Sequence, residues 1–156
     1  MKTLFIALLI SINSYHPNDN CDHLNEIRDI FQAGVNNKEE LAEMIAICKK
    51  YDCDKITPYY AAATMRKAEF VWSPLEKLSN FNKGKKMLES FIKEHPNNIE
   101  AKYIRWLTQK MAPKFLGYHE NIKEDYDYIQ KNITKSDLDK EYQKVILNHI
   151  QKMKHE

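Results

Sequence analysis

Apolar residues recur at spacings of three and four along most of the chain, which is the pattern of amphipathic α-helices. The clearest case is residues 57–111, which we interpret as three consecutive helices joined by turns at Pro and Asn residues. Thr57 followed by Pro58 is typical of a helix start, and this first helix is predicted to run to about Trp72. No segment has the apolar–polar alternation of a half-buried strand.

The remaining two helices of this stretch are bounded by prolines. Ser73-Pro74 ends the first helix, because the residue before a proline is disfavoured in the α region. After a short helical turn over 75–78, a second apolar stripe runs up to His95-Pro96. The third helix, 99–111, is apolar on more than one side, so we expect it to lie near the middle of a bundle.

The flanking regions predict four further helices. One begins at Leu24 and ends at Gly34, and the next begins at Asn37, where Glu40 completes a capping box; we interpret these two as an antiparallel pair. Beyond residue 111, apolar spacing indicates a helix over 122–133 and a last one up to residue 153, capped by Thr134 or Ser136. The sequence therefore predicts an all-α fold of about seven helices, arranged as antiparallel helix pairs in a bundle or short superhelix.

The N-terminus has the features of a secretory signal peptide. Lys2 precedes a short, wholly apolar run, and cleavage is placed after Ser14. A buried N-terminal helix and a lipoprotein with Cys21 as its lipidated residue are the alternatives. We expect residues 1–14 to be a signal peptide, 15–22 a flexible mature N-terminus and 23–156 one helical domain without a permanent membrane span. The protein is then exported, and stays in the periplasm, associates with the cell envelope or is secreted.

Export would place the three cysteines in an oxidising compartment, where disulfides form. Cys48 and Cys53 flank a predicted helix end and are candidates for a local bridge. Two alternatives remain open: Cys21 pairs with one of them, or all three are thiols.

Charge and motifs exclude several classes of chemistry. The formal net charge is only +2, with acids and lysines interleaved, which does not favour a nucleic-acid-binding protein. The sequence holds no zinc, P-loop or G-x-S-x-G motif, and three isolated glycines cannot form a phosphate-binding loop. We predict no cofactor, no metal and no catalytic residue. His149 is interpreted as a core histidine with a hydrogen-bond partner.

Arginine and aromatic residues provide the candidate binding site. Arg66 and Glu69 share a helix face, and one interpretation is a Glu69–Arg105 ion pair that joins two helices. In the other interpretation a peptide-binding groove is lined by arginines and aromatic residues, which are common interface anchors. This candidate set is Arg66, Glu69, Trp72, Arg105, Trp106 and Tyr118. The apolar loop 114–118 is expected to tuck under the bundle, with homo-oligomerisation through it as an alternative.

The segment 65–98 resembles a tetratricopeptide (TPR) repeat. Gly84, Leu88 and Phe91 precede a helix end at HPNN (95–98), and the chain restarts with IEA. The run from Arg105 through RWLTQKMAPKFLGYHENIKED is also similar to small exported proteins of unassigned function from Bacteroidota-type bacteria. The TPR resemblance implies a superhelix of helix pairs with a concave groove. We therefore predict a non-catalytic module of the bacterial cell envelope that binds a protein or peptide; the alternatives are a small envelope enzyme and a structural homo-oligomeric subunit.

Overall fold

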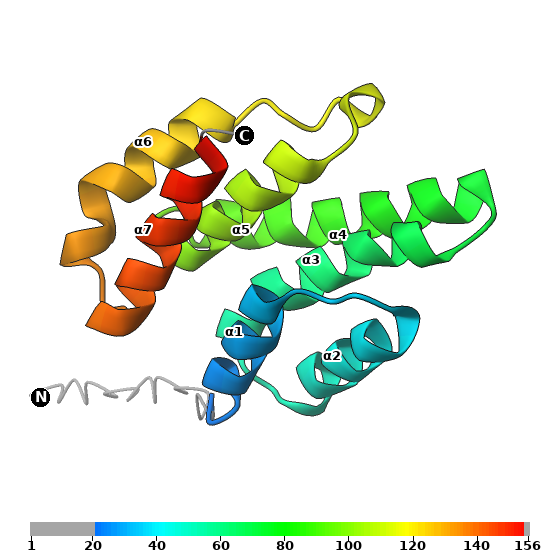
Figure 1. Ribbon diagram of the computed structural model, residues 1–156, viewed down its shortest axis with the longest axis horizontal. Helices are drawn as coiled ribbons and strands as arrows, with labels where there is room; N and C mark the ends of the chain where they lie inside the picture. The colour runs from blue at the N-terminus through cyan, green and yellow to red at the C-terminus, as the bar shows by residue number, and fades with distance from the viewer. Residues whose placement is uncertain (1–20, 155–156) are drawn as a thin grey trace, which may run out of the picture.

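The computed structural model describes residues 21–154, which form seven α-helices and no strand (Figure 1). The predicted signal peptide, 1–14, and most of the predicted flexible segment, 15–22, lie outside the described residues. The helices are α1 (Leu24–Ala33), α2 (Lys38–Lys50), α3 (Thr57–Arg66), α4 (Pro74–Glu94), α5 (Ile99–Met111), α6 (Ile122–Asn132) and α7 (Lys140–Lys154). The prediction of an all-α fold of about seven helices is confirmed.

The N-terminal helices end and begin where the capping residues predict. α1 ends at Gly34, whose φ of 79° is a conformation that favours glycine. At α2, the side chain of Asn37 accepts a hydrogen bond from the Glu40 backbone N–H at 2.9 Å. The carboxylate of Glu40 in turn accepts from the backbone N–H of Asn36 at 2.8 Å, so two orphan donors are satisfied at this helix start.

Two boundaries in the central stretch differ from the prediction. α3 begins at Thr57 but ends at Arg66, and a 3₁₀-helix, Lys67–Phe70, takes the place of its last turn, so the predicted end near Trp72 was too late. α4 is one continuous helix of 21 residues, not a short turn followed by a stripe. The buried ring of Phe81 lies in the supposed gap and fastens that part of α4 to the core.

Helices α3 and α4 pack closely because both carry small residues at their contact. A Cβ added to Gly84 would lie 2.4 Å from the backbone oxygen of Ala61 and 2.7 Å from the backbone nitrogen of Met65. Both distances are too short for a methyl group, so glycine is required for this approach of the two backbones. The low surface predicted around Ala61 is therefore the surface that α4 contacts.

Helix α5 lies at the centre of the described fold. Ten of its 13 residues are buried, among them the polar side chains of Glu100, Lys102, Arg105 and Gln109. It contacts α3, α4 and α6, which confirms the prediction of a helix enclosed on several sides. Because buried charged groups require partners, this helix also organises the ion pairs of the protein.

The region between α5 and α7 is only partly as predicted. In the loop 114–118, Tyr118 is buried and Leu116 half-buried, whereas Phe115 is 87% exposed, so the loop tucks under at Leu116 and Tyr118 but not at its Phe. The predicted caps of α7 were wrong. Asp139 caps it by accepting from the Tyr142 backbone N–H at 2.8 Å, while the Ser136 hydroxyl donates back to the carbonyl of Ile133.

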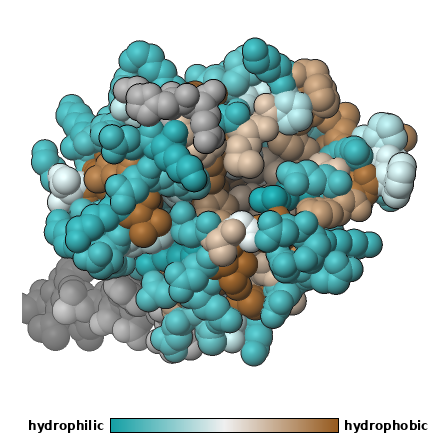
Figure 2. All heavy atoms as spheres, in the orientation of Figure 1, coloured by the Kyte–Doolittle hydropathy of each residue, from teal (hydrophilic) through white to brown (hydrophobic). Residues whose placement is uncertain are grey.

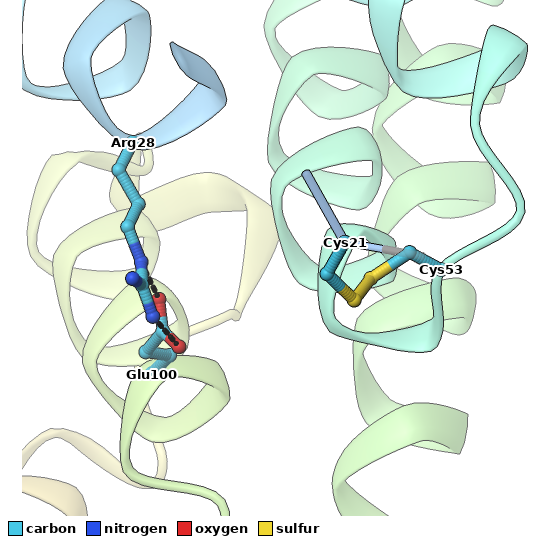
Figure 3. The surroundings of a disulfide bond; sticks show 4 residues. All are labelled: Cys21, Arg28, Cys53 and Glu100. Atoms are coloured by element: carbon cyan, nitrogen blue, oxygen red, sulfur yellow. Dashed lines mark hydrogen bonds and ion pairs between the residues drawn. A yellow bond between two sulfur atoms is a disulfide. The ribbon is translucent and has the colours of Figure 1, made fainter. Parts of the chain in front are cut away.

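A disulfide joins Cys21 to Cys53, and Cys48 is a free, buried thiol (Figure 3). The preferred prediction, a Cys48–Cys53 bridge, was therefore wrong. Cys48 lies on the buried face of α2, whereas Cys53 follows the helix end in an extended conformation beside the start of α1. The bridge closes a separation of 32 residues and fixes Cys21, at the end of the segment predicted to be flexible.

None of the helices described between residues 21 and 154 combines the length and apolar character needed to cross a bilayer.

Candidate functional site

A polar cleft of about 520 Å³ lies where the start of α1, the α4–α5 turn, the end of α6 and the segment leading into α7 meet. Its volume is within the range of small-ligand and peptide sites. Four asparagine side chains line it, and we call it the amide cleft after them: Asn25, Asn97, Asn98 and Asn132. Lys55, Lys135, Asp137 and Asp139 add charges of both signs.

The floor of the amide cleft is a buried ion pair. The guanidinium of Arg28 on α1 donates to both carboxylate oxygens of Glu100 on α5, at 2.8 and 2.6 Å (Figure 3). Its third donor group reaches Asn25 at 2.9 Å, and its plane lies over the ring of Tyr142, with 4.4 Å from Cζ to the ring centroid. Arg28 therefore connects α1, α5 and α7 through one rigid fork.

Two buried tyrosines lie behind this floor and bind Glu100 or each other. Tyr59 donates its hydroxyl hydrogen to Glu100, and the hydroxyl oxygens of Tyr59 and Tyr142 lie 2.6 Å apart. Burial, reinforced by the charge of Glu100, raises the pKa of Tyr59 and raises that of Tyr142 to about 12. Burial lowers the pKa of Arg28, but the hydrogen bonds and charge of Glu100 outweigh it, so the net shift is upward and Arg28 stays cationic.

Two asparagines present hydrogen-bond donors to the cleft. The side-chain oxygen of Asn98 accepts from the Ala101 backbone N–H at 2.8 Å, which caps α5. The side-chain oxygen of Asn25 accepts from Arg28. Because both partners can only donate, these bonds fix the orientation of each amide, and the NH₂ groups have no hydrogen-bond partner within residues 21–154.

The other two asparagines sit beside Tyr128. The NH₂ group of Asn132 donates to the Tyr128 backbone carbonyl at 2.8 Å, which leaves the Asn132 side-chain oxygen as an acceptor. Asn97 accepts from the Tyr128 hydroxyl at 3.0 Å, so its NH₂ group is a further donor. The amide cleft thus offers both donors and an acceptor in orientations set by the fold.

A second buried ion cluster lies on the other half of α5. Arg105 donates to both oxygens of Asp125, at 2.6 and 2.7 Å, and to Glu89 at 2.9 Å, while Tyr118 donates to the other oxygen of Glu89 at 2.6 Å. Burial raises the pKa of Asp125, and the Arg105 guanidinium opposes that rise. The predicted Glu69–Arg105 ion pair was wrong, because Arg105 is directed to α4 and α6 instead.

The six residues of the predicted groove divide into two groups. Arg105, Trp106 and Tyr118 are buried, and the polar atoms of Arg105 and Tyr118 bind the carboxylates of Asp125 and Glu89. Arg66 and Glu69 pair with each other at 3.4 Å near the end of α3, and Trp72, 98% exposed, follows in the connection to α4. The structure therefore does not bring the six together on one open surface.

Little in the local sequence pattern indicates the amide cleft. Asn97 and Asn98 have the pattern of a turn and cap, which is one of their roles, and Asn25 and Asn132 lie in ordinary helix termini. Only the fold brings residues near 25, 98 and 132 together. To predict that these asparagines lie together, one would need to know how the helices pack, and the sequence pattern does not specify that packing.

The described residues hold no cluster of metal ligands, and one histidine packs against the core. Across positions 21–154, no three His, Cys, Asp or Glu side chains gather as metal ligands. His149 on α7 is half-buried, and its Nδ1 lies 2.5 Å from the Tyr103 hydroxyl oxygen, so the prediction of a hydrogen-bonded histidine packed on the core is confirmed.

Comparisons with protein-family models, with curated proteins and with solved structures found no match for this chain. The fold and the cleft therefore define its class only as an all-α protein with a polar cleft at one end. The TPR resemblance stays a prediction.

Proposed function

We propose that this protein is a non-catalytic module of the bacterial cell envelope that binds an extended peptide segment of a protein partner in the amide cleft. The observation that carries the proposal is the set of oriented asparagine side chains. Asn25 and Asn98 keep donors available, and Asn132 keeps an acceptor, because the fold already uses the other half of each amide.

A peptide backbone matches these groups chemically. Each of its residues carries one N–H donor and one carbonyl acceptor, and both need partners when they leave water. Side-chain amides can supply such partners without requiring a particular side chain on the ligand. The NH₂ groups of Asn25 and Asn98 fit peptide carbonyls, and the oxygen of Asn132 fits a peptide N–H.

The charges of the amide cleft favour a peptide that carries both signs. Lys55 and Lys135 lie on its rim together with Asp137 and Asp139. This balance disfavours a purely anionic ligand such as a nucleic acid, whose phosphates would meet the carboxylates.

The floor of the amide cleft is suited to a preorganised site. Arg28, Glu100, Tyr59 and Tyr142 hold one another through buried hydrogen bonds, so few side chains would have to become ordered on binding. The Cys21–Cys53 disulfide ties the chain just before α1 to the segment before α3, and Leu24 and Lys55, which follow the two cysteines in sequence, line the cleft.

Two features favour an exported protein, namely the apolar start of the chain and the disulfide. The apolar start of the chain has the pattern of a signal peptide. A disulfide persists in oxidising compartments such as the periplasm and is rare in the cytosol.

The test starts from the mature chain beginning at Tyr15, used to select binders from a displayed library of random peptides. A selected peptide is then titrated by calorimetry into wild type, Asn25→Ala/Lys135→Ala and the matched control Asn82→Ala/Lys83→Ala. The control makes the same changes at two exposed positions of α4, away from the cleft.

We expect the cleft variant to bind about 10- to 30-fold more weakly, since two hydrogen-bonding groups contribute about 1 kcal/mol each. The control should bind as wild type does, and circular dichroism should show that both variants are folded. Equal affinity of the cleft variant and wild type, or no selected peptide at all, contradicts the proposal.

A further inference from the structure

Two segments that contact each other form a basic and apolar surface away from the amide cleft. They are residues 77–86 of α4 and residues 110–118, which connect α5 to α6. The ring of Tyr118 packs edge-on against Phe81, with 5.8 Å between centroids, and the ammonium of Lys85 lies 4.8 Å from the Tyr118 ring centroid. We call these two segments together the basic apolar surface.

The charges on the basic apolar surface are all of one sign. Its two segments contain six lysines and no carboxylate: Lys77, Lys83, Lys85, Lys86, Lys110 and Lys114. None of the six makes an ion pair with the residues described between 21 and 154. Two carboxylates flank the α4 segment: Glu76 precedes it and is exposed, and Glu89 follows it and is already bound to Arg105 and Tyr118. This part of the molecule is therefore strongly basic although the whole chain has a formal charge of only +2.

Large apolar side chains are exposed among these lysines. Phe115 is 87%, Met111 60% and Leu78 47% exposed. On α4 the exposed row continues one turn further to Leu75, 80% exposed, and to Trp72 just before the helix. Figure 2 shows apolar residues at the upper right and right edges of the molecule, among others on this face, and the α5–α6 and α3–α4 connections lie on that side in Figure 1.

We propose that the basic apolar surface, with Trp72 and Leu75, docks the protein onto an anionic lipid bilayer. Aromatic and leucine side chains enter the headgroup region of membranes, and lysines around them are attracted to anionic headgroups. The lysine side chain suits this role because it carries a point charge on a long, flexible, apolar stem. Six lysines against the single exposed carboxylate of Glu76 leave the surface positive, which is complementary to such a bilayer.

The docking surface begins at Trp72 and Leu75, at the opposite end of α4 from the amide cleft. This helix has 21 residues, so its two ends are about 30 Å apart. Trp72 and Leu75 are at its beginning, whereas Asn97 and Asn98 follow its end. Docking would therefore leave the cleft open to solvent, and the inference stands independently of the peptide-binding proposal.

The experiment measures partition of the chain from Tyr15 onto vesicles by flotation. The vesicles are phosphatidylcholine alone or phosphatidylcholine with 30% phosphatidylglycerol. We expect at least tenfold stronger partition onto the anionic vesicles, weakened by 0.5 M salt. Partition that is equal on both vesicles, or undetectable on the anionic ones at low salt, overturns the proposal.

Matched variants separate the docking surface from general charge and hydrophobicity. Lys83→Glu/Lys114→Glu should lose at least tenfold in partition, whereas Lys38→Glu/Lys131→Glu, with the same net charge but other positions, should lose less than threefold. Phe115→Ser should lose at least fivefold and Val145→Ser, an exposed position on α7, should not. Equal losses within each pair overturn the assignment of the surface.

Tryptophan fluorescence reports the orientation directly. Trp72 is 98% exposed and Trp106 only 2%, so a blue shift on vesicle binding must come mainly from Trp72. We expect the shift with anionic vesicles and its loss on Trp72→Phe. Binding without any shift, or complete competition by polyglutamate at equal charge, would mean that the surface recognises charge alone, and the membrane proposal is then wrong.

Discussion

Replacing Glu100 by Gln should destabilise the protein by about 3 kcal/mol, because the buried Arg28 cation then keeps only the exposed carboxylate of Asp139, 3.9 Å away, as a counter-charge. The Arg28 and Glu100 side chains are only 11% and 6% exposed, and the carboxylate accepts three hydrogen bonds, two from Arg28 and one from Tyr59. Removing one partner of a buried pair costs about 3–5 kcal/mol. Because Gln keeps one oxygen that can accept a hydrogen bond, we expect a loss of stability at the lower end of this range.

The matched control is Glu89→Gln, the same change in a second ion cluster. The Glu89 side chain is 34% exposed, and its partner Arg105 keeps both hydrogen bonds to Asp125 when Glu89 loses its charge. We therefore expect a loss of at most about 1 kcal/mol. Gln and Glu have similar helix propensities, so the difference between the two variants reports the ion pair and not the helix.

Urea unfolding followed by circular dichroism measures both losses. With a slope near 2 kcal/mol per molar urea, the midpoint should fall by about 1.5 M for Glu100→Gln and by 0.5 M or less for Glu89→Gln. The double variant Arg28→Met/Glu100→Leu should be more stable than Glu100→Gln, since it leaves no uncompensated charge. Equal midpoints for the two Gln variants would refute the view that the Arg28–Glu100 pair holds the floor of the amide cleft.

Three further changes test other parts of the fold. Gly84→Ala should destabilise the protein by about 2 kcal/mol, because the new Cβ would meet the α3 backbone. In an open helix the same change would stabilise by about 1 kcal/mol, so a melting temperature that rises contradicts the close contact. The double variant Cys21→Ala/Cys53→Ala should lose about 4 kcal/mol of its free energy of unfolding by the loop-entropy relation for a separation of 32 residues. Urea unfolding measures this loss, and a value below about 1 kcal/mol would mean that the bridge does not constrain the unfolded chain. Burial raises the pKa of Cys48 from 9.0 to about 11 and that of Tyr142 from 10.0 to about 12. The folded protein therefore retains protons that the unfolded chain releases, and the free energy of unfolding should fall between pH 9 and 12. Cys48→Ala should remove part of that fall between pH 9 and 11, and urea midpoints that do not change with pH would contradict it.

Local sequence signals were sufficient for most helices of this protein. Asn37 with Glu40 and Asn98 cap the helix starts that they indicate, because capping chemistry acts over three or four residues. α3 also begins at Thr57-Pro58, but with Pro58 in its first turn and no side-chain cap. The central position of α5 followed from apolar residues on several of its sides.

Long-range pairing could not be predicted in the same way. Arg105 has a carboxylate within reach on α4 and another on α6, and only the packing of those helices decides that Glu89 and Asp125 are its partners and Glu69 is not. The same holds for the cysteines, where Cys53 pairs across 32 residues rather than with its near neighbour Cys48. The amide cleft is a third case, since its asparagines come from different helix ends.

The interruption that was predicted in α4 is absent for a different reason. The residues after Leu78 are polar apart from Phe81 and have no caps, so local propensity alone suggests an interruption. Burial of Phe81 against Tyr118 supplies a tertiary contact that keeps this part helical.

The central claim, that the amide cleft binds a peptide, is tested most directly by mapping a selected peptide onto the protein with backbone amide chemical shifts. We predict that the largest shifts occur in residues 97–99 and 132–139, with α2 (38–50) unchanged and no response from residues 110–118. Shifts that are largest at 110–118, or spread evenly over all helices, would contradict the claim.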